Sequence, residues 1–199
     1  MNKSKKSNNS WDSCWDGYKG SNFFGRLRIN RIANIITKRL GKKLKFIDIG
    51  IGPGDLSIAL KERNYIQFGV DTSKKSLEIC KHRGLNVEYN DAFNLNIKDN
   101  TYDLSFSDGL LEHFPDKNDV RKLISEHIRV SKKYVMISLP STYWTNTIYR
   151  LLRPYDVKEY RIPFKKFKSM LKEFKNVKII QSSYYNFGLC YYVILEKIK

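Results

Sequence analysis

The sequence predicts an α/β fold built on one mostly parallel sheet that ends in an antiparallel pair of strands. Between residues 45 and 140, short apolar runs alternate with helical segments, a pattern typical of βαβ units and a parallel sheet. Beyond residue 174, two apolar runs follow each other with no helix between them. Strands joined so briefly must be antiparallel, because a parallel crossover needs a dozen or more residues.

The elements follow one another at a regular pace. A helix is expected over residues 24–40, because six apolar residues recur at near-helical spacing between Leu27 and Leu40 and Gly41 can terminate it. Strands are expected at 45–50, 66–71, 86–89, 102–107, 134–139, 177–182 and 190–196. Further helices are expected at 55–63, 73–83, 120–129 and 164–174.

Composition and charge indicate one globular domain with basic ends. The 199 residues are 41% hydrophobic and 29% charged, and the net charge is +17. Residues 1–46 and 132–199 each carry +10, whereas residues 47–131 carry −3. Such an excess favours anionic partners but does not choose among nucleic acid, phosphorylated ligands and an acidic membrane surface. Residues 1–10 are expected to form a disordered basic tail, and residues 11–199 the domain.

Cysteine usage and the N-terminus favour a cytoplasmic protein. Cys14, Cys80 and Cys190 are far apart and form no C-x-x-C pair, so neither a metal site nor a disulfide framework is expected. Residues 1–10 lack the apolar region of a signal peptide. No apolar stretch approaches the roughly 20 residues that span a bilayer.

A glycine-rich loop follows the first strand and opens the next helix. Its sequence runs from Asp48 to Gly54 and has glycines at 50, 52 and 54, where the backbone must turn tightly and approach a ligand closely. A dinucleotide-binding G-x-G-x-x-G loop would place its third glycine at position 55. That residue is Asp55, which would repel a pyrophosphate, so NAD binding is disfavoured.

An acidic residue followed by G-x-G-x-G resembles the first motif of class I S-adenosylmethionine-dependent methyltransferases, and the order of motifs along residues 45–140 is similar to theirs. The resemblance implies a Rossmann-like, doubly wound, mostly parallel seven-stranded sheet with an antiparallel C-terminal hairpin. It implies S-adenosylmethionine as cofactor, a lid and helix at residues 11–44, a cofactor-binding core at 45–140, and a substrate side at 141–199.

The resemblance also assigns cofactor-binding residues. Those of the first motif are Asp48, Gly50, Gly52 and Gly54. Asp71, with Thr72 beside it, matches the acidic residue that accepts hydrogen bonds from both ribose hydroxyls. Asp91, Ala92 and Phe93 match the motif at the adenine. Residues 102–114, which include Ser107 and Leu110, resemble the fourth-strand signature of the ubiquinone and menaquinone methyltransferases.

The substrate side carries several candidates. His113 is a candidate general base, because its ordinary pKa of roughly 6.5 suits proton removal near neutrality. His82 and His127 are expected on solvated helix surfaces. Tyr18 and Lys19 are candidate partners for the methionine carboxylate.

Aromatic residues are expected around the acceptor. Trp144 begins a helical stripe that continues with Ile148, Leu151 and Leu152 and could roof the substrate or pack on the sheet. Tyr143, beside it, adds aromatic surface that could hold an aromatic or lipid-like acceptor. Four N-terminal aromatic residues, besides Tyr18, are expected to fold over the site as a lid: Trp11, Trp15, Phe23 and Phe24.

These features predict a methyltransferase acting on a small molecule that is anionic or partly apolar. No [DNS]-P-P-[YF] loop follows the fourth strand, and no cysteine lies near strands four or five, so the usual nucleic-acid base chemistries of the family are disfavoured. An RNA methyltransferase that uses the basic ends is the alternative, and a non-catalytic S-adenosylmethionine-binding module is a second. Oligomeric state and acceptor atom stay open.

Overall fold

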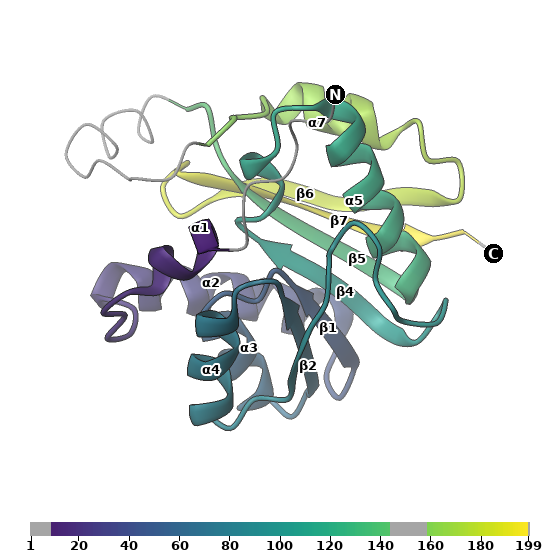
Figure 1. The fold of residues 1–199 in the computed structure, drawn as a ribbon. Helices are drawn as coiled ribbons and strands as arrows, with labels where there is room; N and C mark the ends of the chain where they lie inside the picture. The colour runs from purple at the N-terminus through teal and green to yellow at the C-terminus, as the bar shows by residue number, and fades with distance from the viewer. Residues whose placement is uncertain (1–8, 144–158, 199) are drawn as a thin grey trace, which may run out of the picture.

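A computed structural model describes residues 9–143 and 159–198, which form a seven-stranded sheet flanked by helices (Figure 1). The strand order is β3-β2-β1-β4-β5-β7-β6. The strands are β1 (Lys45–Ile49), β2 (Ile66–Asp71), β3 (Val87–Tyr89), β4 (Tyr102–Asp108), β5 (Ser131–Pro140), β6 (Val177–Tyr185) and β7 (Cys190–Lys197).

The pairing confirms the predicted topology. Strands β1 to β5 are parallel, while β7 runs antiparallel to both β5 and β6. The chain leaves β1 toward β2 and β3, then returns to the other side of β1 with β4. The point between β1 and β4 is therefore a topological switch point, where open α/β sheets bind ligands at the carboxyl ends of their strands.

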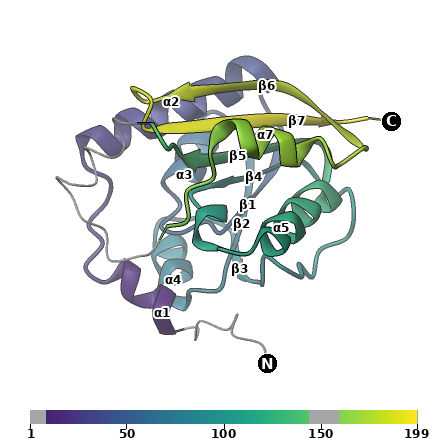
Figure 2. The ribbon, with the colours of Figure 1, turned by 90° about the horizontal axis from the view of Figure 1, so that it is seen from above.

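Helices cover both faces of the sheet. The longer helices are α2 (Phe23–Leu40), α3 (Asp55–Lys61), α4 (Lys74–His82), α5 (Lys117–Val130) and α7 (Phe164–Leu171). One apolar core joins α2 and α3 to the sheet, and a second joins α5 and α7 to its opposite face (Figure 2). Side-chain caps begin three of these helices, because Asn22, Ser73 and Asp116 accept from the first-turn N–H groups of α2, α4 and α5.

Some boundaries differ from the prediction. Helix α5 begins at Lys117 rather than residue 120, because Asp116 caps it. Strand β5 begins at Ser131, where polar residues conceal the apolar pattern. The expected tail boundary at residue 10 falls inside a short helix α1 (Asn9–Asp12), which continues into the 3-10 turn η1 (Ser13–Trp15).

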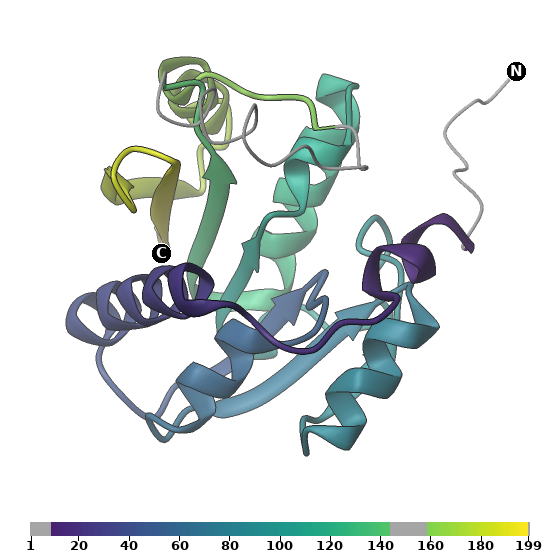
Figure 3. The same cartoon turned by 90° about the vertical axis from the view of Figure 1, so that its left-hand side faces the viewer.

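The segment after η1 crosses in front of the sheet edge and enters α2 (Figure 3). Before η1, Asp12 of α1 anchors the N-terminal segment at the start of α4. Its carboxylate accepts hydrogen bonds from Ser73 Oγ at 2.6 Å and from the Lys75 N–H at 3.1 Å. Two residues that the sequence placed in the lid, Phe23 and Phe24, are instead 62% and 64% exposed at the start of α2.

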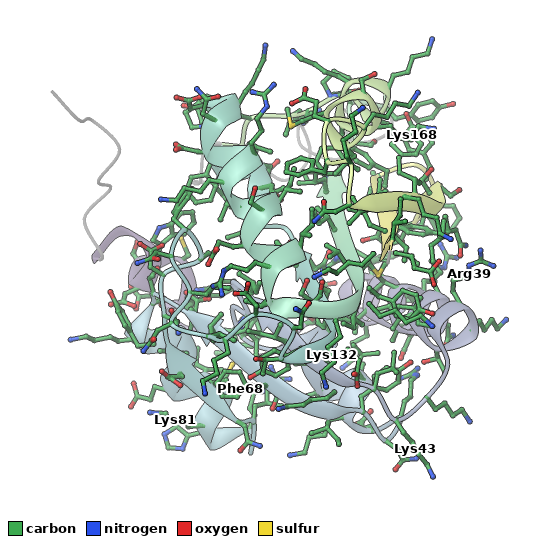
Figure 4. All side chains as sticks on the ribbon, turned by 90° about the vertical axis from the view of Figure 1, so that its right-hand side faces the viewer. Arg39, Lys43, Phe68, Lys81, Lys132 and Lys168 are labelled. Atoms are coloured by element: carbon green, nitrogen blue, oxygen red, sulfur yellow. The ribbon has the colours of Figure 1, made fainter. Side chains whose placement is uncertain are left out.

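Basic side chains lie on the outside of the fold. Lys43, Lys81 and Lys132 extend into solvent from three different elements or loops (Figure 4). Within residues 9–143 and 159–198, no helix combines the length and apolar character that a membrane span requires.

One expectation about the helices is wrong. His82 is exposed as predicted, but His127 is fully buried where α5 packs on β4. The Ser105 hydroxyl donates to the His127 carbonyl at 2.9 Å and lies 3.2 Å from Nδ1. The Nδ1–H tautomer satisfies this pair, and burial lowers the pKa of His127 to about 3.

This burial predicts a loss of stability in acid. Below pH 6.5, His127 is protonated in the unfolded state but stays neutral in the folded state. The free energy of unfolding therefore falls as the pH drops toward 3. His127→Leu should weaken that dependence by about 2 kcal/mol between pH 7 and pH 5, at roughly 1.4 kcal/mol per pH unit. Urea unfolding at both pH values measures it, with exposed His82→Leu as the control. Parallel losses in the His127 variant and the wild type would contradict the argument.

Candidate functional site

The glycine loop joins β1 to α3 at the carboxyl edge of the sheet. Gly50, Gly52 and Gly54 all have positive φ, between 54° and 77°. A Cβ on Gly50 or Gly54 would lie 2.8 Å from the Leu110 side chain or 2.4 Å from that of Leu85. These two glycines therefore allow close packing of the loop. The backbone of Gly52 instead faces the ring of Trp15.

Asp71, the last residue of β2, holds this loop in place. Its Oδ2 accepts from the Gly52 N–H at 2.9 Å, and its Oδ1 accepts from the Ser73 N–H at 2.8 Å. Burial raises the pKa of Asp71, although both hydrogen bonds oppose that shift. Oδ2 also lies 3.3 Å from the Ser76 hydroxyl, which donates to the Gly52 carbonyl as well. Thr72 lies beside it and is half-buried.

Asp48 connects the two elements that flank the glycine loop, β1 and α3. It is buried at the end of β1 and accepts a 2.8 Å hydrogen bond from Ser57 Oγ of α3. Burial raises the pKa of this carboxyl well above its usual range. Asp48 thus links β1 to α3 from inside the protein.

The loops that follow β3 and β4 carry apolar side chains that pack against the core. Ala92, Phe93 and Leu110 are half-buried, and the Phe93 ring packs edge-on against Phe114 at 4.8 Å. The exposed carboxylate of Asp91 accepts from the Phe93 N–H at 2.9 Å and so fixes this turn. Ser107 at the end of β4 is buried, and its hydroxyl makes no hydrogen bond to the described residues.

The N-terminal segment lies directly on these residues. The Trp15 ring is 3.0 Å from where a Cβ of Gly52 would be. The Trp11 ring packs edge-on against His113, with centroids 5.0 Å apart. The segment therefore reaches from the loop after β1 to the turn after β4 (Figure 3).

Tyr18 is engaged with the protein itself. Its hydroxyl donates to Asp55 at 2.5 Å, and Asp55 also pairs with Arg83 at 2.8 Å. Burial and the neighbouring Asp55 raise the pKa of Tyr18 to about 12. Lys19 is exposed. A polar hollow of about 470 Å³ opens to solvent beside the contact between the N-terminal segment and α4, and Asp12, Asp16 and Glu78 are among its lining residues.

A buried polar network occupies the β4, β5 and β7 side of the same edge. Arg28 of α2 pairs with Asp108 of β4 at 2.6 Å, and Ser138 of β5 donates to Asp108 at 2.7 Å. The Ser138 hydroxyl is also 2.7 Å from the Tyr185 hydroxyl. Sequence reasoning missed Arg28 and Asp108. Asp108 directly follows an expected strand, but its partner lies 80 residues away.

Glu112 lies next to His113, the candidate general base predicted from the sequence. It lies in the 3-10 turn η2 (Leu111–His113), and only 4% of it is exposed. Its Oε2 makes no hydrogen bond to the described residues. Burial raises the pKa of this carboxyl to about 8.

Of the two aromatic residues expected on the substrate side, Tyr143 is 48% exposed and packs on Tyr184 with centroids 5.9 Å apart. Trp144 and the rest of its stripe lie outside the described residues.

The chain is similar to known methyltransferases. Residues 47–137 match the family model of a methyltransferase domain. Norajmaline N-methyltransferase of Rauvolfia serpentina is 34% identical over 110 residues, which are 51% of this chain and 37% of that protein. The chain thus spans little more than a third of the length of this curated relative.

Solved structures share the fold. Magnesium protoporphyrin IX methyltransferase of Synechocystis with bound SAH has a TM-score of 0.74 and 16% identity, covering 96% of this chain and 94% of its own. A SAM-dependent methyltransferase of Thermotoga maritima, titled a possible histamine N-methyltransferase, has a TM-score of 0.65 and 18% identity, covering 86% and 93%.

The state of Glu112 makes a testable prediction about stability. An unfolded glutamate ionises near pH 4.5, whereas the folded one holds its proton until about pH 8, so the wild type loses stability between these values. Glu112→Gln should remove this loss and gain a few kcal/mol on the wild type between pH 5 and pH 8, at roughly 1.4 kcal/mol per pH unit. Chemical unfolding across this range measures the difference. An equal pH dependence in both proteins would show that Glu112 is not buried as an acid.

Proposed function

Because the chain carries a class I S-adenosylmethionine-dependent methyltransferase domain, with S-adenosylmethionine as its cofactor, we propose that it transfers a methyl group to a small-molecule acceptor. The observation that carries the proposal is the hydrogen bond of Asp71 with the backbone of Gly52 at the switch point of the sheet.

The residues around this pair fit the cofactor. Asp71 accepts short hydrogen bonds from the N–H groups of Gly52 and Ser73, whereas its contact with the Ser76 hydroxyl is long, at 3.3 Å. Because that hydroxyl also donates to the Gly52 carbonyl, a ribose hydroxyl can take its place on Asp71. The backbone of Gly52 accommodates a flat group at close range, since the Trp15 ring already packs there. Ala92, Phe93 and Leu110 supply an apolar slot of the kind that an adenine requires.

Bound there, S-adenosylmethionine supplies an electrophilic methyl group on a positively charged sulfur. The chain's contribution to such a displacement is to hold the acceptor in line and to exclude water. Trp11 and Trp15 cover the edge between the loop after β1 and the turn after β4, which places them well for water exclusion. The carboxyl ends of β1, β2 and β3 form the cofactor half of this sheet edge. The ends of β4 and β5, which lie beside them, form the acceptor half.

The acceptor half favours a small molecule over RNA. Asp108 and Glu112 place two carboxyl groups there, and Arg28 is already paired with Asp108. A phosphate backbone binds through lysine and arginine contacts, and Arg28 would have to give up its pairing with Asp108 to make one. The basic residues lie instead on the outer surface (Figure 4).

Formation of S-adenosylhomocysteine tests the function. The purified chain, S-adenosylmethionine and panels of metabolites and RNA should give turnover with a metabolite. Turnover restricted to RNA, with an affinity that falls steeply with salt, would favour the RNA alternative. Cofactor binding without turnover on any acceptor would favour a non-catalytic module.

Asp71 offers a sharper prediction about the cofactor. Asp71→Ala should weaken S-adenosylhomocysteine binding by ~2–4 kcal/mol, because charge-assisted hydrogen bonds to the ribose and the anchor of Gly52 are both lost. Calorimetry measures the affinity. Asp103→Ala is the matched control, since Asp103 accepts from the Lys45 N–H at 2.9 Å, at the opposite ends of β4 and β1. Unchanged affinity in a folded Asp71 variant would contradict the ribose assignment.

A further inference from the structure

The acceptor half contains one buried carboxyl group that the proposed function leaves unexplained. Glu112 lies four residues beyond the end of β4, in a turn whose Leu110 side contacts the glycine loop. Its Oε1 is 3.3 Å from where a Cβ of Gly109 would lie, while Oε2 has no hydrogen-bond partner among the described residues. The carboxyl group is therefore inside the protein and close to the switch point.

The groups that face Glu112 do not neutralise it. Arg28 of α2 is the nearby cation, and it is already paired with Asp108 of β4. Glu159 adds a further carboxylate charge. From β7, Cys190 and Tyr191 face Glu112, and burial raises the pKa of both, so they stay neutral. The charges of Glu159 and Asp108 both raise the pKa of Glu112, and that of Arg28 lowers it.

A buried carboxyl group without a hydrogen-bond partner on Oε2 is unfavourable unless a ligand donates a hydrogen bond to it. Burial of a polar group without a hydrogen-bond partner costs on the order of 1–3 kcal/mol, and burial of a charge costs more. A hydrogen-bond donor that carries positive charge would offset both costs. An anionic acceptor would add to the repulsion from Asp108 and Glu159.

We propose that Glu112 binds an N–H group of the methyl acceptor through Oε2 and takes its proton, so that the acceptor is an amine. The inference rests on the proposed function. In the step, the bound ammonium group first passes one proton to the Glu112 carboxylate, which frees the nitrogen lone pair. The lone pair then forms the N–C bond as the S–C bond of the cofactor breaks. The products are the N-methylammonium ion, S-adenosylhomocysteine and protonated Glu112.

The protonation behaviour of Glu112 suits this role. Burial raises its pKa to about 8, within reach of neutral pH, which is where a general base works best. A bound ammonium group would favour the ionised carboxylate. His113 is the other candidate base, but its ring packs against Trp11.

Binding is tested first, on the full chain saturated with S-adenosylhomocysteine. Two matched pairs serve as probes: tryptamine with indole-3-propionate, and 2-phenylethylamine with 3-phenylpropionate. The amines should raise the melting temperature more than their acid twins, and Glu112→Gln should abolish the difference. Glu126→Gln is the matched control, because Glu126 is held by Arg129 and the Leu95 N–H outside the site. Acid twins that stabilise the wild type as well as the amines do would overturn the proposal.

Turnover is tested next, with the amines as acceptors. Glu112→Gln should bind S-adenosylhomocysteine like the wild type and lower the rate at least ~100-fold, the usual contribution of a general base. The wild-type rate should rise with pH through about 8, and this rise should vanish in Glu112→Gln and persist in His113→Gln. A Glu112→Gln variant with the wild-type rate and pH profile would overturn the proposal. So would loss of the rise in His113→Gln alone.

The two proposals fail in different ways. Methylation of acceptors without an N–H group, with no Glu112-dependent amine binding, would leave the proposed function standing and overturn the amine inference. Amine binding that depends on Glu112, without S-adenosylhomocysteine formation from any acceptor, would overturn the proposed function and with it the proton transfer.

Discussion

The hydrogen bond from the Gly52 N–H to Asp71 is the constraint on which the site depends. It ties the loop after β1 to the end of β2, so two strands that are parallel neighbours also share one ligand-binding edge. The packing of Leu110 and Leu85 leaves no room for side chains at Gly50 and Gly54. The loop is thus fixed on both sides before any ligand arrives, which reduces the ordering cost of binding.

The sheet edge divides into two halves of different chemistry. The ends of β1, β2 and β3 carry the glycine loop, Asp71 and the apolar side chains of Ala92 and Phe93. The ends of β4 and β5 present the network of Arg28, Asp108 and Ser138, followed by Glu112. The acidic character of the second half opposes the net charge of +17. Net charge therefore describes the surface and the solubility of this protein, while the local charge at the edge governs which molecule can enter.

Local patterns predicted most of the fold and the first half of the site. Apolar runs, caps and glycines act within a few residues, and they located every described strand to within a few positions. The second half depends on contacts between distant residues, such as Arg28 with Asp108 and Ser138 with Tyr185, which no local pattern reports. His127 is a different case. It shares the buried face of α5 with Leu123 and Ile124, so helical spacing could have indicated its burial, but its polarity was given more weight.

The N-terminal segment shares its anchors with the glycine loop and Asp71. Asp12 accepts from the hydroxyl of Ser73, whose N–H binds Asp71, and Trp15 packs on Gly52, whose N–H binds the same carboxylate. Tyr18 and Ser21 both donate to Asp55, the residue that follows Gly54. A ligand held by Asp71 and Gly52 must therefore either be covered by this segment or displace it. In both cases the docking of the segment and the binding of the ligand are thermodynamically linked, and each changes the free energy of the other by the same amount.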